Sequence, residues 1–227
     1  MSAPLSFLSC LLAAGALAAA PFAALGRAQD KQTLAEIAAE AKRKKQESTR
    51  PVLTNDDLGT AALGLPPVRV LRRSEYVPAL APFVPTPMTV VEEMLALAGV
   101  QPDDVVFDIG SGDGRIVIAA AELFGARAVG IEIDEALVER SRKTIAEKKL
   151  EDKVHIIHAN ALDVDLGPAD VVTLYLTDPG NEMLRPHLEK TLRPGTRVVS
   201  HQFLIPKWTL VDRRTVEGKV IFLYIVP

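Results

Sequence analysis

Asp108-Ile109-Gly110-Ser111-Gly112-Asp113-Gly114-Arg115 is a glycine-rich loop between two segments of different periodicity. The apolar run Val105–Ile109 predicts a buried strand before it, and Arg115–Phe124 has helical spacing that ends at Gly125. Glycines at such a junction let the backbone approach a ligand closely and adopt positive φ. The start of the helix also offers free N–H groups. These residues therefore predict a strand, a ligand-binding loop and a helix.

Strands and helices alternate on both sides of this loop. Before the loop, a helix is expected over Met88–Ala98, ending at Gly99. After the loop, strands are expected at 128–133, 154–158, 170–176 and 196–201, and helices at 135–149 (capped by Asp134) and 182–192. Two closing strands are expected at 210–216 and 219–226, joined at Glu217-Gly218. This alternation predicts an α/β, Rossmann-like, doubly wound sheet of seven strands, mostly parallel, with an antiparallel C-terminal hairpin. Ligands of such sheets bind outside the carboxyl ends of the strands.

The spacing and charge of the loop restrict its ligand. The pattern is G-x-G-x-G, whereas dinucleotide-binding loops have G-x-G-x-x-G. Asp108 and Asp113 would repel a pyrophosphate but suit a ligand with an ammonium or sulfonium group. Glu132 ends the second strand, 22 residues after Gly110, where a carboxylate can accept hydrogen bonds from ribose hydroxyls. An alternative interpretation of the same residues is an ordinary tight turn with capping acids. A nicotinamide-dependent reductase is a third possibility, but the sequence has no Tyr-x-x-x-Lys pair to support it.

The overall composition is that of a soluble globular chain with additions. The chain has 227 residues, 48% hydrophobic and 24% charged, with a net charge of −3, which gives no indication of a nucleic-acid partner. The single cysteine, Cys10, excludes a disulfide scaffold and a Cys-rich zinc site. His155 and His158 would point to opposite faces of one strand, so no metal site is expected. Nothing in the sequence indicates the oligomeric state.

The sequence divides into three regions: an apolar segment at 1–28, a basic helix and proline-rich lead-in at 29–87, and a domain at 88–227. Leu5–Leu25 is long enough to span a bilayer. Gly26-Arg27-Ala28 fits a cleaved signal peptide, which would export the protein. The basic residues that follow, including Lys42–Lys45, fit instead a retained anchor with the domain on the cytoplasmic side. Both interpretations stand on the residues alone, and a solvated helix is expected over 31–47.

The loop and its surroundings resemble the class I, seven-stranded S-adenosylmethionine (SAM)-dependent methyltransferases over roughly residues 83–227. The resemblance implies SAM as cofactor, with its methionine part against Asp108, Gly110, Ser111, Gly112 and Gly114. It places the ribose on Glu132 and the adenine against Ile133. Asn160 stands where the family often has an acid for the adenine amino group; its side-chain oxygen can accept the same hydrogen bond, and Asp163 is a nearby substitute.

A narrower resemblance rests on Phe83-Val84-Pro85-Thr86-Pro87 ahead of a helix together with the loop and the helix after it, Asp108–Ala121. This combination is similar to a subfamily of bacterial proteins of unassigned substrate and of mitochondrial lysine methyltransferases that act on the c-ring protein of ATP synthase and on the adenine nucleotide translocator. It implies that Phe83 and Thr86 help to close the SAM site, although the prolines would also make a rigid corner. It further implies a lysine of a membrane protein as methyl acceptor.

The availability of the cofactor bears on localisation. SAM is made in the cytosol, so a SAM-dependent function favours a membrane-anchored protein whose domain faces the cytoplasm or the mitochondrial matrix. The alternatives for function are a non-catalytic nucleoside-binding module and a methyltransferase of small molecules.

The acceptor side is expected after the fourth strand. Asp178-Pro179-Gly180-Asn181 only half matches the Asn/Asp-Pro-Pro-aromatic motif of methylases that act on exocyclic or amide nitrogens. The catalytic candidates are Asp178, Tyr175 and His201, each with a structural alternative: a helix cap, a core or wall residue, and a satisfied buried histidine. Methyl transfer depends mainly on alignment in a dry site, so a dedicated base is not required.

Overall fold

The computed structural model describes residues 64, 68–70 and 80–227. The chain divides into two units, Met1–Arg50 and Pro51–Pro227, and all described residues belong to the second. The predicted segment at 1–28, the helix at 31–47 and most of the proline-rich lead-in lie outside the described residues. Within the described part, no helix is both long and apolar enough to cross a membrane.

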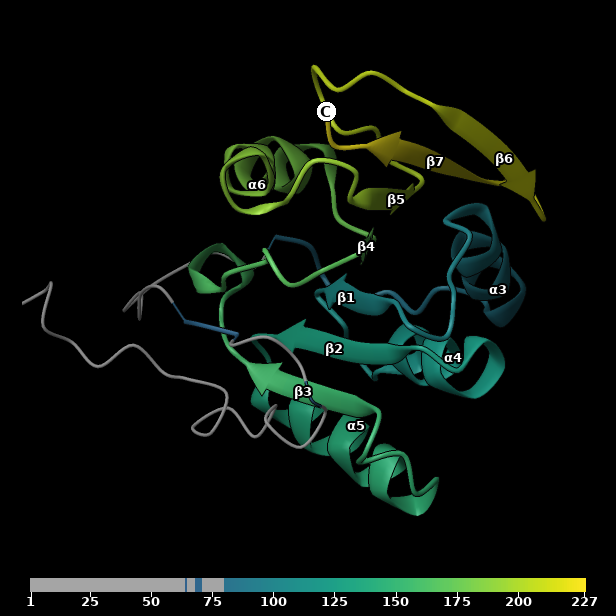
Figure 1. Cartoon of the computed structure of the whole chain (residues 1–227), viewed down its shortest axis with the longest axis vertical. Coiled ribbons are helices and arrows are strands. Elements are labelled where there is room, and N and C mark those ends of the chain that lie inside the picture. The colour runs from purple at the N-terminus through teal and green to yellow at the C-terminus, as the bar shows by residue number, and fades with distance from the viewer. Residues whose placement is uncertain (1–63, 65–67, 71–79) are drawn as a thin grey trace, which may run out of the picture. The chain divides into compact units, whose positions relative to one another are not determined.

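Seven strands form one sheet in the order β3-β2-β1-β4-β5-β7-β6. Their bounds are β1 Val105–Ile109, β2 Arg127–Glu132, β3 Val154–His158, β4 Val171–Leu174, β5 Arg197–His201, β6 Asp212–Val216 and β7 Lys219–Ile225 (Figure 1). Strands β1 to β5 pair in parallel, whereas β7 is antiparallel to both β5 and β6. The predicted fold class is confirmed, including the C-terminal hairpin, whose turn residues Glu217 and Gly218 both have positive φ.

Helices cover both faces of the sheet. Their bounds are α3 Met88–Leu97, α4 Arg115–Phe124, α5 Glu135–Glu147 and α6 Asp178–Thr191, with a short 3-10 helix, η2, at Ala161–Asp163. Apolar residues of α3, α4 and α5 pack with one face in a single buried cluster. Leu184 and Leu188 of α6 pack with the other face, which also includes Val68 and Val70. The core is therefore split by the sheet into two apolar layers.

Two predicted elements differ most from the structure, while the others that differ do so by one or two residues at an end. The strand expected at 170–176 ends at Leu174, because the pairings of β4 with β1 and with β5 both stop there. The helix expected from residue 182 begins four residues earlier, at Asp178, with Pro179 in its first turn. Proline is favourable there because its missing N–H would have no helical partner.

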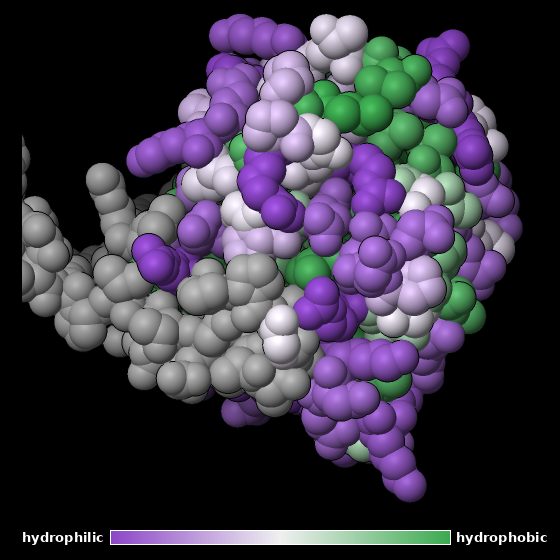
Figure 2. All heavy atoms as spheres, viewed as in Figure 1, coloured by the Kyte–Doolittle hydropathy of each residue, from purple (hydrophilic) through white to green (hydrophobic). Residues whose placement is uncertain are grey.

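Strand β6 is an exposed edge of the sheet. Its residues Asp212, Arg213 and Arg214 are charged, which discourages pairing with another chain. Figure 2 shows a largely hydrophilic surface with an apolar area near the top of the view, where the C-terminal hairpin lies; Val211 and Ile225 are exposed apolar residues of this part of the chain.

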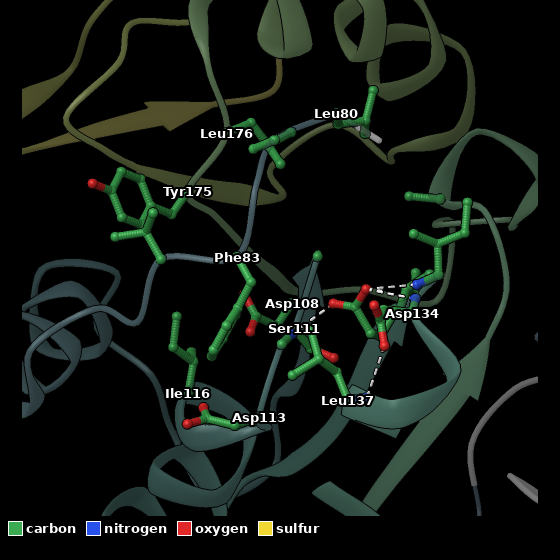
Figure 3. A pocket seen from close by; sticks show the side chains of 18 of the residues that line it. Leu80, Phe83, Asp108, Ser111, Asp113, Ile116, Asp134, Leu137, Tyr175 and Leu176 are labelled. Carbon is green, nitrogen blue, oxygen red and sulfur yellow. Dashed lines mark hydrogen bonds between the residues drawn. The ribbon is translucent and has the colours of Figure 1, made fainter. Parts of the chain in front are cut away.

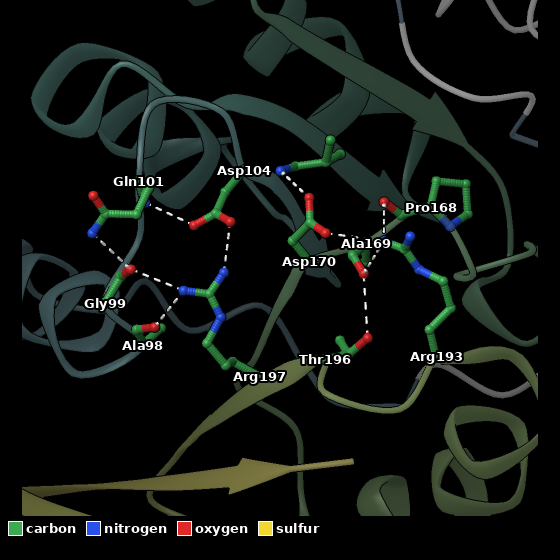
Figure 4. A network of polar contacts seen from close by, with 11 residues as sticks. Ala98, Gly99, Gln101, Asp104, Pro168, Ala169, Asp170, Arg193, Thr196 and Arg197 are labelled. Carbon is green, nitrogen blue, oxygen red and sulfur yellow. Dashed lines mark hydrogen bonds and ion pairs between the residues drawn. The ribbon is translucent and has the colours of Figure 1, made fainter. Parts of the chain in front are cut away.

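Two arginine networks join the amino ends of the strands (Figure 4). Arg197 donates to Asp104 Oδ1 at 2.6 Å and to the Gly99 carbonyl at 2.8 Å. Arg193 donates to Asp170 Oδ1 at 2.9 Å. The side chains of the first pair are 26% and 11% exposed, and those of the second pair 57% and 36%. The first network therefore carries more of the stability, because solvent screens the second.

Replacing each arginine by alanine tests this difference. We expect Arg197→Ala to lower the free energy of unfolding by about 2 kcal/mol, since it leaves the buried Asp104 carboxylate without its charged partner. Arg193→Ala is the matched control, with an expected loss below about 1 kcal/mol. Urea unfolding followed by circular dichroism measures the free energy of unfolding of both variants. Equal losses of stability would contradict the larger contribution of the Arg197 network.

Candidate active site

A cavity of about 430 Å³ opens at the carboxyl ends of β1, β2 and β4. The strand order reverses between β1 and β4, the place where open α/β sheets bind their ligands. Of the residues predicted for the site, those that line the cavity are Phe83, Thr86, Asp108, Gly110, Ser111, Gly112, Glu132, Ile133, Asn160 and Tyr175 (Figure 3). Gly114, Asp163, Asp178 and His201 do not line it.

The Glu132 carboxylate in the cavity wall is held by backbone hydrogen bonds. Its Oε2 accepts from the Gly112 N–H at 2.7 Å, and its Oε1 accepts from the N–H groups of Ile133 and Asp134 at 2.8 and 2.9 Å. The residue is only 7% exposed. Three backbone donors thus fix its orientation at the end of β2, where the sequence predicted the ribose contact.

The N–H groups of the glycine loop are engaged within the protein. Gly110 and Ser111 donate to the Ile131 carbonyl at 2.9 and 3.0 Å, and Gly114 donates to the Ser111 carbonyl at 2.9 Å. With Gly112 bound to Glu132, the loop does not present these donors to a phosphate, as an anion-binding loop would. Its geometry agrees with the predicted exclusion of a pyrophosphate ligand.

Asp108 places a second carboxyl group in the cavity wall. It is 2% exposed, and Thr173 Oγ1 donates to its Oδ1 at 2.7 Å. Burial, with the nearby charges of Glu132 and Asp113, raises the pKa of Asp108 to about 7, although the Thr173 hydrogen bond opposes the rise. A cation beside Asp108 would favour the ionised carboxylate. Ser111 Oγ is buried against Gly130 of β2 and has no hydrogen-bond partner among the described residues.

Residues 80–87, here called the strap, lie against the glycine loop. A Cβ at Gly112 would come within 2.5 Å of the Phe83 ring, so glycine is required for this contact. Arg115 donates to the Thr86 carbonyl at 2.9 Å. At the other end of the strap, Thr177 Oγ1 donates to the Leu80 carbonyl at 3.1 Å. The placement of Phe83 and Thr86 is compatible both with the predicted closing role and with a rigid corner.

Asp113 has a different role from the one its position in the loop predicted. Arg115 donates to both of its oxygens, from Nε to Oδ1 at 2.9 Å and from Nη2 to Oδ2 at 2.6 Å. This bidentate pair holds the pKa of Asp113 below its usual range. Asp113 lines the cavity, but its negative charge is largely offset by Arg115. The other acids that line the cavity are Asp108, Glu132 and Asp134, of which Asp134 caps α5.

Gly114 and Asn160 also serve local structure. Gly114 is the N-cap of α4 at φ 80°, and a Cβ there would lie 2.9 Å from Ser141 Cβ, so this glycine allows α4 to pack on α5. Asn160 Oδ1 accepts from the Leu162 N–H at 3.1 Å and caps η2. The predicted adenine contact of Asn160 remains a prediction, as does that of Ile133.

The residues after β4 separate into a wall and a cap. Tyr175 lines the cavity, whereas Asp178 is exposed as the first residue of α6. The expectation that Asp178 caps this helix is wrong: Thr177 is the N-cap, and its hydroxyl accepts from the Gly180 N–H at 3.2 Å. The hydroxyl of threonine at this position satisfies one of the free N–H groups of the first turn.

Two site residues lacked an assigned role at the sequence level. Thr173 lies opposite Asp108 in the register of β4 with β1. Its position two residues before Tyr175 was the one feature of the sequence that could have suggested a role in the site. Arg115 reaches a backbone carbonyl 29 residues earlier in the chain, and no sequence pattern marks such a partner.

Known proteins share both the sequence and this fold. The family model described as ANTKMT methyltransferase domain matches residues 108–212. A protein-lysine N-methyltransferase of Saccharolobus islandicus is 43% identical over 156 residues, which are 66% of this chain and 96% of that protein. The chain belongs to the class I SAM-dependent methyltransferases, in the protein-lysine N-methyltransferase family.

Two further relatives of this methyltransferase differ in their named substrates. A lysine N-methyltransferase of Rattus norvegicus, named for the c-ring protein of ATP synthase, is 34% identical over 137 residues, 60% of this chain and 62% of that protein. A crystal structure described as an RNA methyltransferase from Salinibacter ruber, in complex with S-adenosyl-L-homocysteine, has a TM-score of 0.62 and 46% identity; the match covers 63% of this chain and 94% of that one.

The cavity of this methyltransferase fits its cofactor. The buried carboxyl of Asp108 borders the cavity and, when ionised, would attract the cationic methionine part of SAM. Glu132 would hold the ribose at the end of β2. No group of three or more metal-ligating side chains occurs among residues 64, 68–70 and 80–227.

Gly112 provides a test of the contact between loop and strap. We expect Gly112→Ala to weaken SAM binding at least about tenfold, because the φ of 56° and the Phe83 ring both oppose a Cβ. Gly195→Ala is the matched control: its φ of 87° carries the same strain, but a Cβ there meets nothing within 4 Å. Calorimetric titration of SAM measures both, and unchanged affinity in Gly112→Ala would contradict the proposed packing.

The raised pKa of Asp108 predicts pH-dependent cofactor binding. Below about pH 7 the carboxyl is protonated and neutral, and above it the carboxylate attracts the cationic ligand. If only the ionised form binds well, affinity should rise about tenfold between pH 6 and pH 8, and binding near pH 7 should release protons. Asp108→Asn should bind weakly and lose this dependence. Calorimetry in buffers of different ionisation enthalpy detects the proton release, and its absence in the unaltered protein would exclude this role.

Proposed function

We propose that this methyltransferase transfers the methyl group of SAM to a lysine side chain of a membrane-associated protein. The observation that carries the proposal is the 43% identity to a protein-lysine N-methyltransferase over 96% of its length. The relatives named for the c-ring protein of ATP synthase and for the adenine nucleotide translocase support a membrane protein as acceptor. A non-catalytic cofactor-binding module and a small-molecule methyltransferase are the weaker alternatives.

The site supports this chemistry by alignment and by exclusion of water. SAM, when bound, supplies a methyl group already activated by its sulfonium. The carboxylates of Asp108 and Glu132 hold the cofactor, and Phe83 covers the loop beneath it. The acceptor amine must lose a proton before it attacks, and a desolvated site lowers the pKa of an amine without a dedicated base. Of the three catalytic candidates, Tyr175 alone borders the cavity.

We further propose that the segment at 1–28 anchors the protein and that the domain faces the cytoplasm or the mitochondrial matrix, where SAM is available. The uncharged stretch at 1–26 and the basic residues after it support this topology. Export after signal-peptide cleavage is the alternative.

RNA methylation is the competing function, because the relative from Salinibacter ruber is named for it. The charge balance of the chain does not favour it, since acidic residues outnumber basic ones by 29 to 26. RNA-binding surfaces carry clustered positive charge that contacts the phosphates.

One labelling experiment separates these functions. The full-length protein is incubated with SAM carrying a radioactive methyl group and with membranes, soluble proteins or total RNA of the source organism. We expect label in a membrane protein, identified by mass spectrometry as methyl-lysine and absent with Glu132→Gln. Label in RNA or in soluble protein alone would overturn the proposal, and SAM binding without any transfer would establish the non-catalytic module.

A further inference from the structure

Three aromatic rings meet at the carboxyl ends of β4 and β5. The Tyr175 ring, at the cavity wall, lies 4.0 Å from the ring of His201 and 6.4 Å from that of Phe203, measured between centroids. Leu174 pairs with Ile109, the residue just before the glycine loop, so Tyr175 follows β4 beside the start of that loop. In Figure 3, Tyr175 lies on the side of the cavity away from Asp134 and Leu137. The cofactor contacts described above leave this group of rings unused.

His201 is enclosed and neutral beneath Tyr175. It is 1% exposed, its Nδ1 lies 3.3 Å from Thr86 Oγ1, and its Nε2 is buried without a hydrogen-bond partner among the described residues. Burial, with a smaller effect of Lys219, lowers the pKa of His201 to about 4. A ring in this position cannot exchange protons with a substrate in the cavity, but its packing can fix the Tyr175 ring.

The turn after β5 is strained and held from several sides. Gln202 has a φ of 67°, and the Phe203 N–H donates back to the His201 carbonyl at 2.9 Å. Ser200 Oγ donates to the Phe203 carbonyl at 2.5 Å, and Asn181 Nδ2 to the same carbonyl at 3.3 Å. The backbone N–H of Gln202 also pairs with β7 at 2.7 Å. Strain of this kind persists only where surrounding contacts over-determine it, and it concentrates at functional sites.

We propose that Tyr175 orients the methyl acceptor, a primary amine on a flexible aliphatic chain, and that His201 is a positioning residue that holds the Tyr175 ring. This inference rests on the proposed function. The face of the ring gives the amine a cation–π contact and its carbon chain an apolar wall on approach. After deprotonation to water, the amine nitrogen forms a bond to the methyl carbon while the carbon–sulfur bond breaks and its electron pair stays on sulfur. His201 takes no proton in this step.

Nuclear magnetic resonance measures acceptor binding without turnover. Nα-acetyl-L-lysine methylamide is added to the full-length protein saturated with S-adenosyl-L-homocysteine, and saturation transfer to its side-chain methylenes is recorded. We expect transfer in the unaltered protein and in Tyr175→Phe, which keeps the ring, and loss of at least about tenfold in affinity in Tyr175→Leu. Transfer to cytidine monophosphate instead of the lysine amide, or to neither compound, would overturn the proposal.

Kinetics then separate positioning from proton transfer. With the same amide as acceptor, His201→Ala should lower kcat/KM about tenfold through the acceptor KM, and His201→Phe, which restores a ring beneath Tyr175, should recover most of it. Equal losses in both variants would overturn the positioning role. His187→Gln is the matched control, because His187 is another partly buried histidine, bonded to the Val164 carbonyl at 2.7 Å and remote from the three rings.

Calorimetric SAM affinity distinguishes the failure of this proposal from the failure of the proposed function. An unaltered protein that does not bind SAM would refute the function itself. Unchanged SAM affinity together with unchanged acceptor binding in Tyr175→Leu would refute only the role of Tyr175.

Discussion

The Glu132 carboxylate joins the turn after β2 to the glycine loop after β1. Because it accepts from Gly112 as well as from Ile133 and Asp134, the two turns cannot move independently. Each of its oxygens is engaged by a backbone N–H, yet the side chain still borders the cavity. The same group therefore orders the turns around the cavity and borders it where SAM would place its ribose. Such preorganisation lowers the conformational cost of cofactor binding, since the groups that receive the ligand are already placed.

The strap extends this order across the glycine loop. Asp113 of the loop forms an ion pair with Arg115 in the first turn of α4. The remaining guanidinium nitrogen of Arg115, Nη1, donates to the Thr86 carbonyl and so holds the strap against the loop. Thr86 in turn contacts His201 on β5. Polar contacts of 2.6 to 3.3 Å thus connect the glycine loop with His201 at the end of β5. A bidentate arginine suits this position because its planar fork fixes direction as well as charge.

Local sequence predicted most of the fold, because strands, helices and caps depend on neighbouring residues. The α4 helix and strands β1 and β3 have the predicted bounds, and Asp134 caps α5 as expected. The errors lie where tertiary contacts override local pattern. Tyr175 and Leu176 continue the apolar run of β4, but they have no pairing partner because β1 has already turned into the loop.

The cofactor half of the site was more predictable than the acceptor half, for the same reason. Its residues lie within one strand–loop–helix unit and at the end of the next strand, at spacings set by the fold. The acceptor half is assembled from the strap and the ends of β4 and β5, so its contacts join residues as far apart as Thr86 and His201. The sequence pointed to His201 and Tyr175 separately, but it could not predict that their rings lie 4.0 Å apart.

The strand order reverses between β1 and β4, and the residues on the two sides of this point have different functional requirements. On the β1–β2 side, Asp108 and Glu132 face a ligand whose charge and shape do not vary, so substitutions there affect every reaction of the enzyme. On the β4–β5 side, Tyr175 and the turn at Gln202, which we propose to face the acceptor, make no hydrogen bond to Glu132 or Asp108 among the described residues. Substitutions of Tyr175 and Phe203 should therefore affect acceptor binding more than cofactor binding, whereas His201 is also connected to the glycine loop, through Thr86 and Arg115.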